Sequence, residues 1–596
     1  MTNEAQTRSA SRRELLIVAA IWLTVSCWMA WSARTLVSER LYSDPDDPMR
    51  LVQVRDWLAG QSWFDVTQYR LNAPVGGAMH WSRLVDVPIG AVILLARPFV
   101  GQQGAESAAL ILVPLVTLGI AMFLVYRIGS KLMNGSAALL AVIATPASLG
   151  AMKQMRIMRI DHHGWQIVLA LLCVLALIDK RPRRDAILAG AAMALWLNIS
   201  IEGLPFAAAI SAWLAFEWFL DPAAGARLKG YLGSLTLASA SLFALTHLPS
   251  TWTSNPPDTL NSGHMAAFAA AWLVCLAVVR PDVANRWIRA ALLAIAGLAS
   301  VVALFAIDPH WLEGPFSSLD PLVRNYWYNG VDEGKPIWGL AFHDAAAGLA
   351  QPLVGLAGAL LAIWKAPIAQ RREWIIFTYL LGALTLSGVF VIREATYASV
   401  LSLPGTAFLC EFALIRARKL RLTVARVTAT AASIFIMAPA YAAPALMIPS
   451  DPRLASATQS SDSCVKRSEL EKLDSLPPSN LGVPLDISTA VLASTHHRAI
   501  AGGYHRMSGA IRDVILLFMT SPDEARAVLA RRHVEYLVFC PHTPESVWWS
   551  RHGPNGLAAM LNANRAPDWL EPVDLHLRSL RVWRVRKDAI ASKPIS

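Results

Sequence analysis

Residues 106–131 read ESAALILVPLVTLGIAMFLVYRIGSK, an apolar run that ends at two basic side chains, Arg127 and Lys131. The apolar part, 106–126, is long enough to cross a hydrocarbon core of about 30 Å as a helix. Comparable runs recur at 15–31, 136–153, 164–179, 186–203, 204–220, 231–248, 264–279, 290–307, 344–363, 374–392, 397–415 and 427–447. The pattern predicts an α-helical polytopic membrane protein with about thirteen transmembrane helices.

The composition supports this prediction. Of 596 residues, 55% are hydrophobic and 16% are charged, with a mean hydropathy of +0.41. Soluble domains average about 25% charged residues. The net charge of +11 resides in short basic clusters between the apolar runs, as the positive-inside rule requires. We therefore expect membrane lipids around the chain and no nucleic acid as a partner.

The basic clusters also predict the orientation. Those at Arg280–Arg289, Lys365–Arg372 and Arg416–Arg426 are typical of cytoplasmic loops of a bacterial inner-membrane protein. The long loops 32–105 and 308–343 then face the periplasm. Residues 1–447 are predicted to form the membrane domain, and 448–596 a small periplasmic C-terminal α/β domain.

Short runs along the tail carry the α/β prediction. Strands are expected at Val491–Ser494, Tyr536–Cys540 and Leu580–Val585, and a helix at Ser521–Arg532. Cys464 and Cys540 are the two cysteines of this tail, and an oxidising compartment would allow them to form a disulfide bond.

Carboxylates cluster in the first outer loop, which begins Tyr42-Ser43-Asp44-Pro45-Asp46-Asp47-Pro48-Met49-Arg50. Three carboxylates within four residues repel one another unless a cation lies among them. Asp and Pro also favour a solvated turn, so this interpretation stays open.

A second polar motif, Asp161-His162-His163, lies in a short predicted outer loop just before an apolar run. Ionisable groups at the mouth of a membrane helix are costly unless they pair or bind something. An acid with histidines suits a divalent metal such as Mn²⁺ or Zn²⁺. Capping of the following helix is the alternative.

Further charges are expected on the same face. Asp332 and Glu333 lie in the second long loop, and Arg50, Arg83 and Arg159 lie in outer segments. Three separate outer loops thus bring carboxylates to one side, as a shared cation site requires. Arg393 follows the eleventh apolar run and suits a phosphate, or an ion pair with Glu394.

These motifs and their order resemble the catalytic subunit of the oligosaccharyltransferases, within the GT-C class of membrane glycosyltransferases. The segment Asp44–Arg50 resembles the family's acidic first-loop motif, and Asp161-His162-His163 resembles its Asp-x-His motif. The segment Val331–Pro336 fits the family's Val-x-Glu-x-x-Pro pattern, with the glutamate at Glu333. An arginine after the eleventh helix is also similar, at Arg393.

The resemblance implies a glycosyltransferase that uses a polyprenyl-phosphate-linked sugar donor and a divalent metal, Mn²⁺ or Mg²⁺, with Zn²⁺ as a further candidate. It implies Asp47, Asp161 and His163 as metal ligands, with Asp44 and Asp46 as rivals of Asp47. It assigns Asp47, Asp161 and Glu333 to catalysis. Substrate contacts are expected from Arg50, Arg83, His162 and Arg393.

The acceptor stays open. Family members that glycosylate asparagine carry Trp-Trp-Asp-Tyr-Gly, whereas the nearest segment here, Trp548–Gly553, lacks the Asp and lies late in the tail. Two other functions stay open as well. One is a metal-independent GT-C monosaccharide transferase with a first-loop Asp as general base. The other is a flippase for lipid-linked glycans, although the chain lacks the inverted repeats and midplane polar residues that this function favours.

Overall fold

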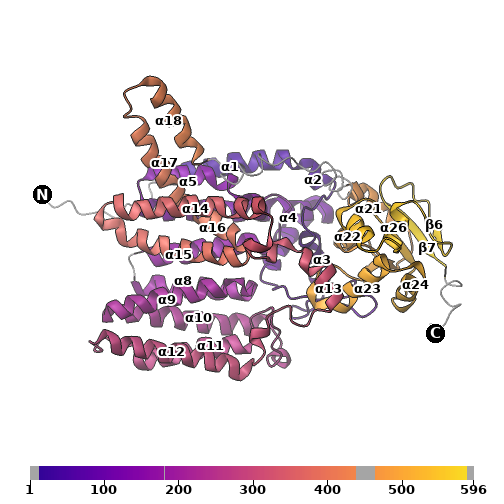
Figure 1. The fold of residues 1–596 in the computed structure, drawn as a ribbon, viewed down its shortest axis with the longest axis horizontal. Helices are drawn as coiled ribbons and strands as arrows, with labels where there is room; N and C mark the ends of the chain where they lie inside the picture. Colours follow the sequence, from indigo (N-terminus) through magenta and orange to yellow (C-terminus); the bar gives the residue numbers. More distant parts are fainter. Residues whose placement is uncertain (1–11, 180–181, 438–462, 587–596) are drawn as a thin grey trace.

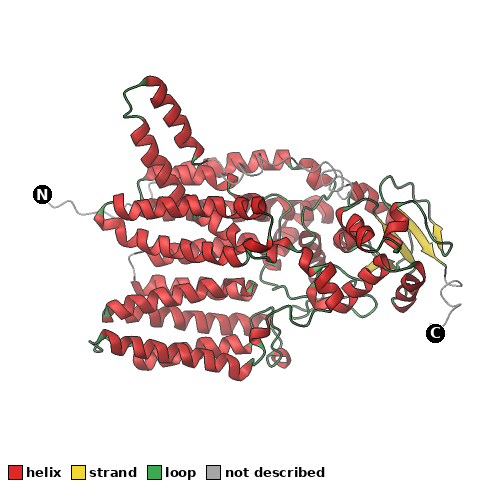
Figure 2. Ribbon diagram, viewed as in Figure 1, coloured by secondary structure: helices red, strands yellow, loops and turns green. Residues whose placement is uncertain are grey.

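Apolar helices that lie side by side make up most of the molecule, and a small layered α/β segment sits at one end of them (Figures 1 and 2). This computed structural model describes residues 12–179, 182–437 and 463–586. The helices of the large part are α1 (Arg12–Ser32), α4 (Asp86–Leu132), α5 (Gly135–Ala144), α6 (Leu149–Gln154), α7 (His163–Ile178), α8 (Pro182–Ile199), α9 (Leu204–Leu220), α10 (Gly225–Thr246), α11 (Ser262–Val278), α12 (Arg286–Ile307), α14 (Phe342–Lys365), α15 (Arg371–Phe390), α16 (Ala395–Leu401), α17 (Leu403–Ala417) and α18 (Thr423–Phe435).

Each predicted apolar run contains a helix, but the runs differ in length and straightness. Seven of the described helices are long and apolar enough to cross a membrane, or eight if α16 and α17, bent by 52°, form one span. The run at 136–153 is divided because Pro146 opens a 3₁₀ turn between α5 and α6. The figure of about thirteen crossings remains a prediction, and residues 438–447 of the last run lie outside the described residues.

The predicted outer loop 32–105 is largely helical. It contains α2 (Arg34–Ser38), α3 (Asp46–Leu58), a hairpin of β1 (Thr67–Gln68) with β2 (Gly77–Ala78), and the start of α4. Gly101 breaks α4 with φ 69° and ψ 178°, a backbone conformation that residues with a Cβ avoid. The loop boundary at 105 therefore falls close to this break.

The C-terminal segment folds around a five-stranded sheet in the order β4-β3-β5-β7-β6. Strand β3 is parallel to β4 and β5, whereas β7 is antiparallel to β5 and β6. The strands are β3 (Asn480–Gly482), β4 (Arg498–Ala499), β5 (Tyr536–Phe539), β6 (Leu570–Pro572) and β7 (Arg581–Val585). Its helices are α21 (Arg467–Leu473), α22 (Leu485–Ser494), α23 (Ser508–Met519), α24 (Pro522–Arg531), α25 (Pro544–His552) and α26 (Leu557–Asn562).

Local predictions for this segment are correct except at one place. Strands β5 and β7 and helix α24 lie where the sequence predicts them. The strand prediction at Val491–Ser494 is wrong, because these residues end α22. A short apolar run has no periodicity that separates a strand from a buried helix. The predicted boundary at 447–448 lies outside the described residues.

Cys464 and Cys540 form a disulfide bond with Cα atoms 6.1 Å apart, which confirms the predicted pairing. The bond joins the segment before α21 to the residue after β5.

The C-terminal segment packs against the outer loops. Arg70 donates to the carbonyl oxygens of Leu492 at 2.9 Å and Thr495 at 2.7 Å. The backbone N–H of Asp320 donates to Ser508 Oγ at 3.0 Å. Buried residues of both loops join one hydrophobic core with the C-terminal segment. In Figure 1 the C-terminal segment lies at the end of the bundle where α3 and α13 (Pro321–Tyr326) lie.

Candidate metal and catalytic centre

The acidic turn before α3 is folded onto the segment that precedes α7. The Asp47 carboxylate accepts hydrogen bonds from the backbone N–H groups of Ile160, at 2.9 Å, and Asp161, at 3.2 Å. Its second oxygen pairs with Arg159 Nη1 at 3.1 Å, and Asp44 pairs with the same nitrogen at 2.8 Å. Asp47 is fully buried, so its oxygens already have partners inside the protein.

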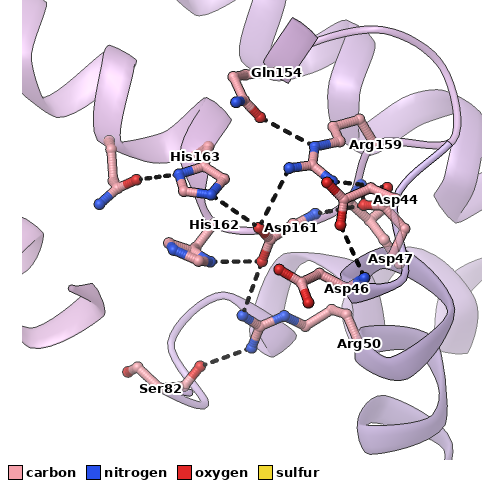
Figure 3. A network of polar contacts seen from close by, with 12 residues as sticks. Asp44, Asp46, Asp47, Arg50, Ser82, Gln154, Arg159, Asp161, His162 and His163 are labelled. Atoms are coloured by element: carbon pink, nitrogen blue, oxygen red, sulfur yellow. Dashed lines mark hydrogen bonds and ion pairs between the residues drawn. The ribbon is translucent and has the colours of Figure 1, made fainter. Parts of the chain in front are cut away.

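Asp46 is in a different position. Its backbone N–H donates to Asp44 Oδ1 at 3.0 Å, but no donor in the described part of the chain reaches its carboxylate. In Figure 3 this carboxylate points toward Asp161. Burial raises the pKa of Asp46 well above its ordinary value, and the nearby carboxylates of Asp44 and Asp161 raise it further. A cation beside Asp46 would remove this penalty.

Asp161 lies at the middle of the network in Figure 3. Its Oδ1 is 2.5 Å from His162 Nδ1 and 3.3 Å from Arg50 Nη2. Its Oδ2 is 3.5 Å from His163 Nε2 and, although buried, takes part in no hydrogen bond. Three ligand atoms, one each from Asp161, His162 and His163, lie within 4.8 Å of one another. Asp161 Oδ2 also lies 3.8 Å from Arg159 Nη2. A carboxylate oxygen beside a ring nitrogen is a donor pair that suits a divalent metal.

Asp86, at the first residue of α4, orients the arginines around Asp161. It pairs with Arg50 Nη1 and Arg83 Nη1, each at 3.2 Å, and accepts from Gln53 at 2.7 Å. The Arg50 guanidinium also lies 4.4 Å from the centre of the Trp81 ring. Arg83 is 1% exposed and donates to loop atoms of Gln53 and Gln61. The structure thus places Arg50 against Asp161 and Arg83 within the first loop.

Carboxylates outnumber guanidinium groups in this network. Five carboxylates gather around three guanidinium groups, and burial raises the pKa of Asp46 and of Asp47, the latter to about 7. The carboxylates belong to Asp44, Asp46, Asp47, Asp86 and Asp161, and the guanidinium groups to Arg50, Arg83 and Arg159. Uncompensated buried charge is strongly unfavourable. A divalent cation at this place would reduce the repulsion among the carboxylates.

A second chain of polar contacts runs from His163 to the loop that carries Glu333. His163 Nδ1 lies 2.8 Å from Gln166 Oε1 and 3.2 Å from the Tyr397 hydroxyl. The Tyr397 hydroxyl donates to Glu202 at 2.7 Å. With Nδ1 engaged in this way, Nε2 of His163 faces Asp161 with its lone pair, as a metal ligand requires.

This series of polar contacts continues to Arg393, which pairs with Glu202 at 2.5 Å and with Glu333 at 2.9 Å. The predicted alternative of an ion pair with Glu394 is not the arrangement found. Arg393 Nε is buried and has no hydrogen-bond partner among the described residues. Glu333, 47% exposed, belongs to a short 3₁₀ turn (Asp332–Gly334) held to the bundle by the hydrogen bond from Ile392 N–H to Lys335 O at 3.0 Å.

The structure therefore brings Asp47, Asp161, His162, His163 and Arg50 into one network, and links Glu333 and Arg393 to it through Glu202. Sequence reasoning named Asp46 only as a rival and missed Gln166, Tyr397 and Asp86. Gln166 had one signal, because a polar residue three positions after His163 shares its helix face. Tyr397 lies in an apolar run 234 residues away from His163 and had none.

Comparisons with known proteins rest on structure. No protein-family model matches the sequence, and no curated protein matches it significantly. The archaeal oligosaccharyltransferase AglB from Archaeoglobus fulgidus, solved with an inhibitory peptide and a dolichol-phosphate, is similar with a TM-score of 0.64 and 12% identity over 98% of this chain and 76% of that chain. The chain has the fold of an oligosaccharyltransferase.

Two further structures of the Archaeoglobus fulgidus enzyme agree. Its apo form gives a TM-score of 0.61 at 14% identity over 93% of this chain and 72% of that chain. Its complex with Zn and sulfate gives 0.55 at 14% identity over 96% and 73%. The structural resemblance expected from the sequence motifs is confirmed.

Proposed function

We propose that the chain is a membrane glycosyltransferase that transfers a sugar or an oligosaccharide from a polyprenyl-phosphate-linked donor to an acceptor at the periplasmic face of a bacterial inner membrane. The observation that carries the proposal is the buried cluster of Asp161, His162 and His163, whose ligand atoms lie within 4.8 Å of one another beside the carboxylates of the first outer loop. The oligosaccharyltransferase fold supports it.

The residues present fit a divalent cation. Asp161, His162 and His163 each offer a ligand atom within 4.8 Å of the others. We add Asp46 to the proposed ligands because its carboxylate is close enough to Asp161 for the two to repel. Asp47, the ligand expected from the sequence, accepts hydrogen bonds from the backbone of Ile160 and Asp161, and we propose for it the role of positioning these residues. A bound divalent cation supplies charge stabilisation at a reacting centre. Mn²⁺, Mg²⁺ and Zn²⁺ remain candidates, and the Archaeoglobus fulgidus enzyme was solved with Zn.

Arg393 is suited to the donor phosphate. Its Nε–H is unpaired, and its remaining contacts, with Glu202 and Glu333, keep the guanidinium plane in place. A fixed guanidinium binds phosphate oxygens with charge-assisted hydrogen bonds. The dolichol-phosphate in the archaeal structure supports a lipid-linked donor.

Glu333 belongs to a loop that is half-exposed at the edge of the network. A loop in this position excludes water once substrate is bound and helps to orient it. The acceptor is the open part of the proposal, because the tail lacks the Trp-Trp-Asp-Tyr-Gly segment.

The test is transfer from a labelled polyprenyl-phosphate-linked sugar pool in isolated membranes, with surface and lipid-linked glycans compared by mass spectrometry between a deletion strain and its parent. We expect the deletion to remove one glycan product, and Asp161→Asn to fail to restore it. An unchanged glycan profile in the deletion strain would reject the proposed function.

A further inference from the structure

A second cluster of metal-ligand side chains lies outside the centre described above. It consists of His80, just after β2, Asp258, in the connection between α10 and α11, and His505, in the C-terminal segment. One ligand atom from each lies within 4.8 Å of the others. Three segments that are far apart in sequence thus converge on one point.

The contacts within the cluster leave one nitrogen unsatisfied. His505 Nε2 lies 2.6 Å from Asp258 Oδ2, and the rings of His80 and His505 have centroids 4.9 Å apart. His80 Nδ1 is buried and has no hydrogen-bond partner among the described residues. His80 therefore has a buried ring nitrogen that no group in the described part of the chain uses, and an imidazole nitrogen is a common zinc ligand.

The surroundings hold these side chains in place. Arg506 donates to both oxygens of Asp258, at 2.6 and 2.7 Å, and to the carbonyl oxygen of Met79 at 3.0 Å. Phe316 packs edge-on against the His505 ring at 5.1 Å. Partners that orient a ligating carboxylate or imidazole are a general feature of metal sites.

We propose that His80, Asp258 and His505 bind a Zn²⁺ ion that ties the first outer loop and the α10–α11 connection to the C-terminal segment. Two imidazoles and one carboxylate form a three-ligand set used by zinc, with the fourth position left to water. Zinc at tetrahedral angles would separate His505 Nε2 and Asp258 Oδ2 to about 3.3 Å, which needs a side-chain shift of about 0.7 Å. Binding would replace the proton shared by these two atoms, and this proton would pass to solvent.

The bond between Arg506 and Asp258 Oδ1 remains possible with the metal in place, because the metal needs only Oδ2. The site shares no residue with the Asp161 centre, and the proposal does not depend on sugar transfer. Its role is cohesion, since the ligands come from the membrane part and from the C-terminal segment.

The test measures zinc bound to the full-length protein in detergent, after chelation and dialysis against buffered Zn²⁺. The parent protein for these measurements carries the substitutions Asp161→Asn and His163→Asn. They weaken metal binding at the Asp161 centre, so that the zinc measured is the zinc bound by His80, Asp258 and His505. We expect one zinc per chain in this parent, and at least a tenfold loss of affinity after His80→Asn or His505→Asn. The matched control is His552→Asn, because His552 is an exposed histidine of the C-terminal segment that bonds only a backbone carbonyl among the described residues, and it should keep the zinc.

The unfolding temperature is a second measurement, and it keeps the test decisive if a substituted protein does not fold. Zinc should raise the unfolding temperature of the parent and of the His552→Asn variant. Absence of both bound zinc and this shift in the parent would overturn the proposal, as would equal zinc affinity in the His80→Asn, His505→Asn and His552→Asn proteins.

Discussion

At the scale of single residues, the structure separates carboxylates that the sequence presents as equivalent. Sequence reasoning predicts a cation among Asp44, Asp46 and Asp47 but has no means to choose between them, because the choice depends on which one meets the backbone of Ile160 and Asp161. That contact joins segments more than a hundred residues apart. Residue type and spacing indicated a candidate site, and tertiary contacts show which carboxylates are engaged by the protein and which are available for the proposed cation.

Asp46→Asn and Asp47→Asn should therefore behave differently. Asp47→Asn replaces a charged acceptor of three hydrogen bonds and should destabilise the protein by about 1–3 kcal/mol. Asp46→Asn removes a carboxylate whose burial cost and repulsion from Asp44 and Asp161 exceed its attraction to Arg159, so it should leave the metal-free protein equally or more stable, while it weakens metal binding at least tenfold. Thermal unfolding in chelator, followed by metal titration, measures both. Equal destabilisation by the two substitutions would contradict the assignment.

Tyr397 is expected to act through His163. Its hydroxyl lies 3.2 Å from His163 Nδ1 and donates to Glu202, so Tyr397→Phe should leave Gln166 as the remaining hydrogen-bond partner of the ring among the described residues and hold its orientation less firmly. Loss of such a partner lowers metal affinity by about 10–100-fold. Tyr379→Phe is the matched control, because the Tyr379 hydroxyl donates to a backbone carbonyl, that of Ala209. If both substitutions lower metal affinity equally, the effect is one of packing and not of His163 orientation.

At the scale of secondary structure, the hydrophobic runs predicted where helices occur but not where they break. Long apolar runs locate helices because a segment inside a bilayer must satisfy its backbone hydrogen bonds internally, as an α-helix does. The breaks at Pro146 and Gly101 depend on local backbone geometry that hydropathy does not report. The strand prediction at Val491–Ser494 was wrong for a related reason. These residues are the end of α22, which begins at Leu485, before the short run on which the prediction was based.

The turn that carries Glu333 yields a test at this scale. Glu333 touches the network only through Arg393, so Glu333→Gln should slow transfer less than Asp161→Asn does. Its neighbour Asp332 is 69% exposed and pairs with Lys335 at 2.6 Å, which makes Asp332→Asn a control for loop structure. We expect wild-type transfer from the control. Equal loss in the Asp332 and Glu333 variants would mean that the fold of the loop, and not the Glu333 carboxylate, is needed.

At the scale of the whole molecule, the order of apolar runs, outer loops and tail predicted the fold, although sequence identity to the archaeal structures is only 12–14%. The burial pattern imposed by a membrane constrains helices strongly, whereas the residues between them are free to diverge. The shared core of the outer loops and the C-terminal segment was not predictable, because it depends on contacts between segments distant in sequence.

Orientation is the prediction that belongs to this scale. A reporter enzyme that is active only in the periplasm, fused to the end of the chain, should be active. The same reporter inserted after Ala284, between α11 and α12, should be inactive because basic residues mark this loop as cytoplasmic. The reverse pattern would place the Asp161 centre on the cytoplasmic side and would contradict the proposed donor access.

The central claim is that Asp46, Asp161 and His163 hold a divalent cation while Asp47 does not. Anomalous diffraction from crystals of the protein grown with Mn²⁺ locates the ion directly. We predict a peak about 2–2.5 Å from an oxygen of Asp46, an oxygen of Asp161 and Nε2 of His163, which Asp161→Asn abolishes. An active protein with no peak at this position, or a peak bound to Asp47 and not to Asp46, would contradict the account.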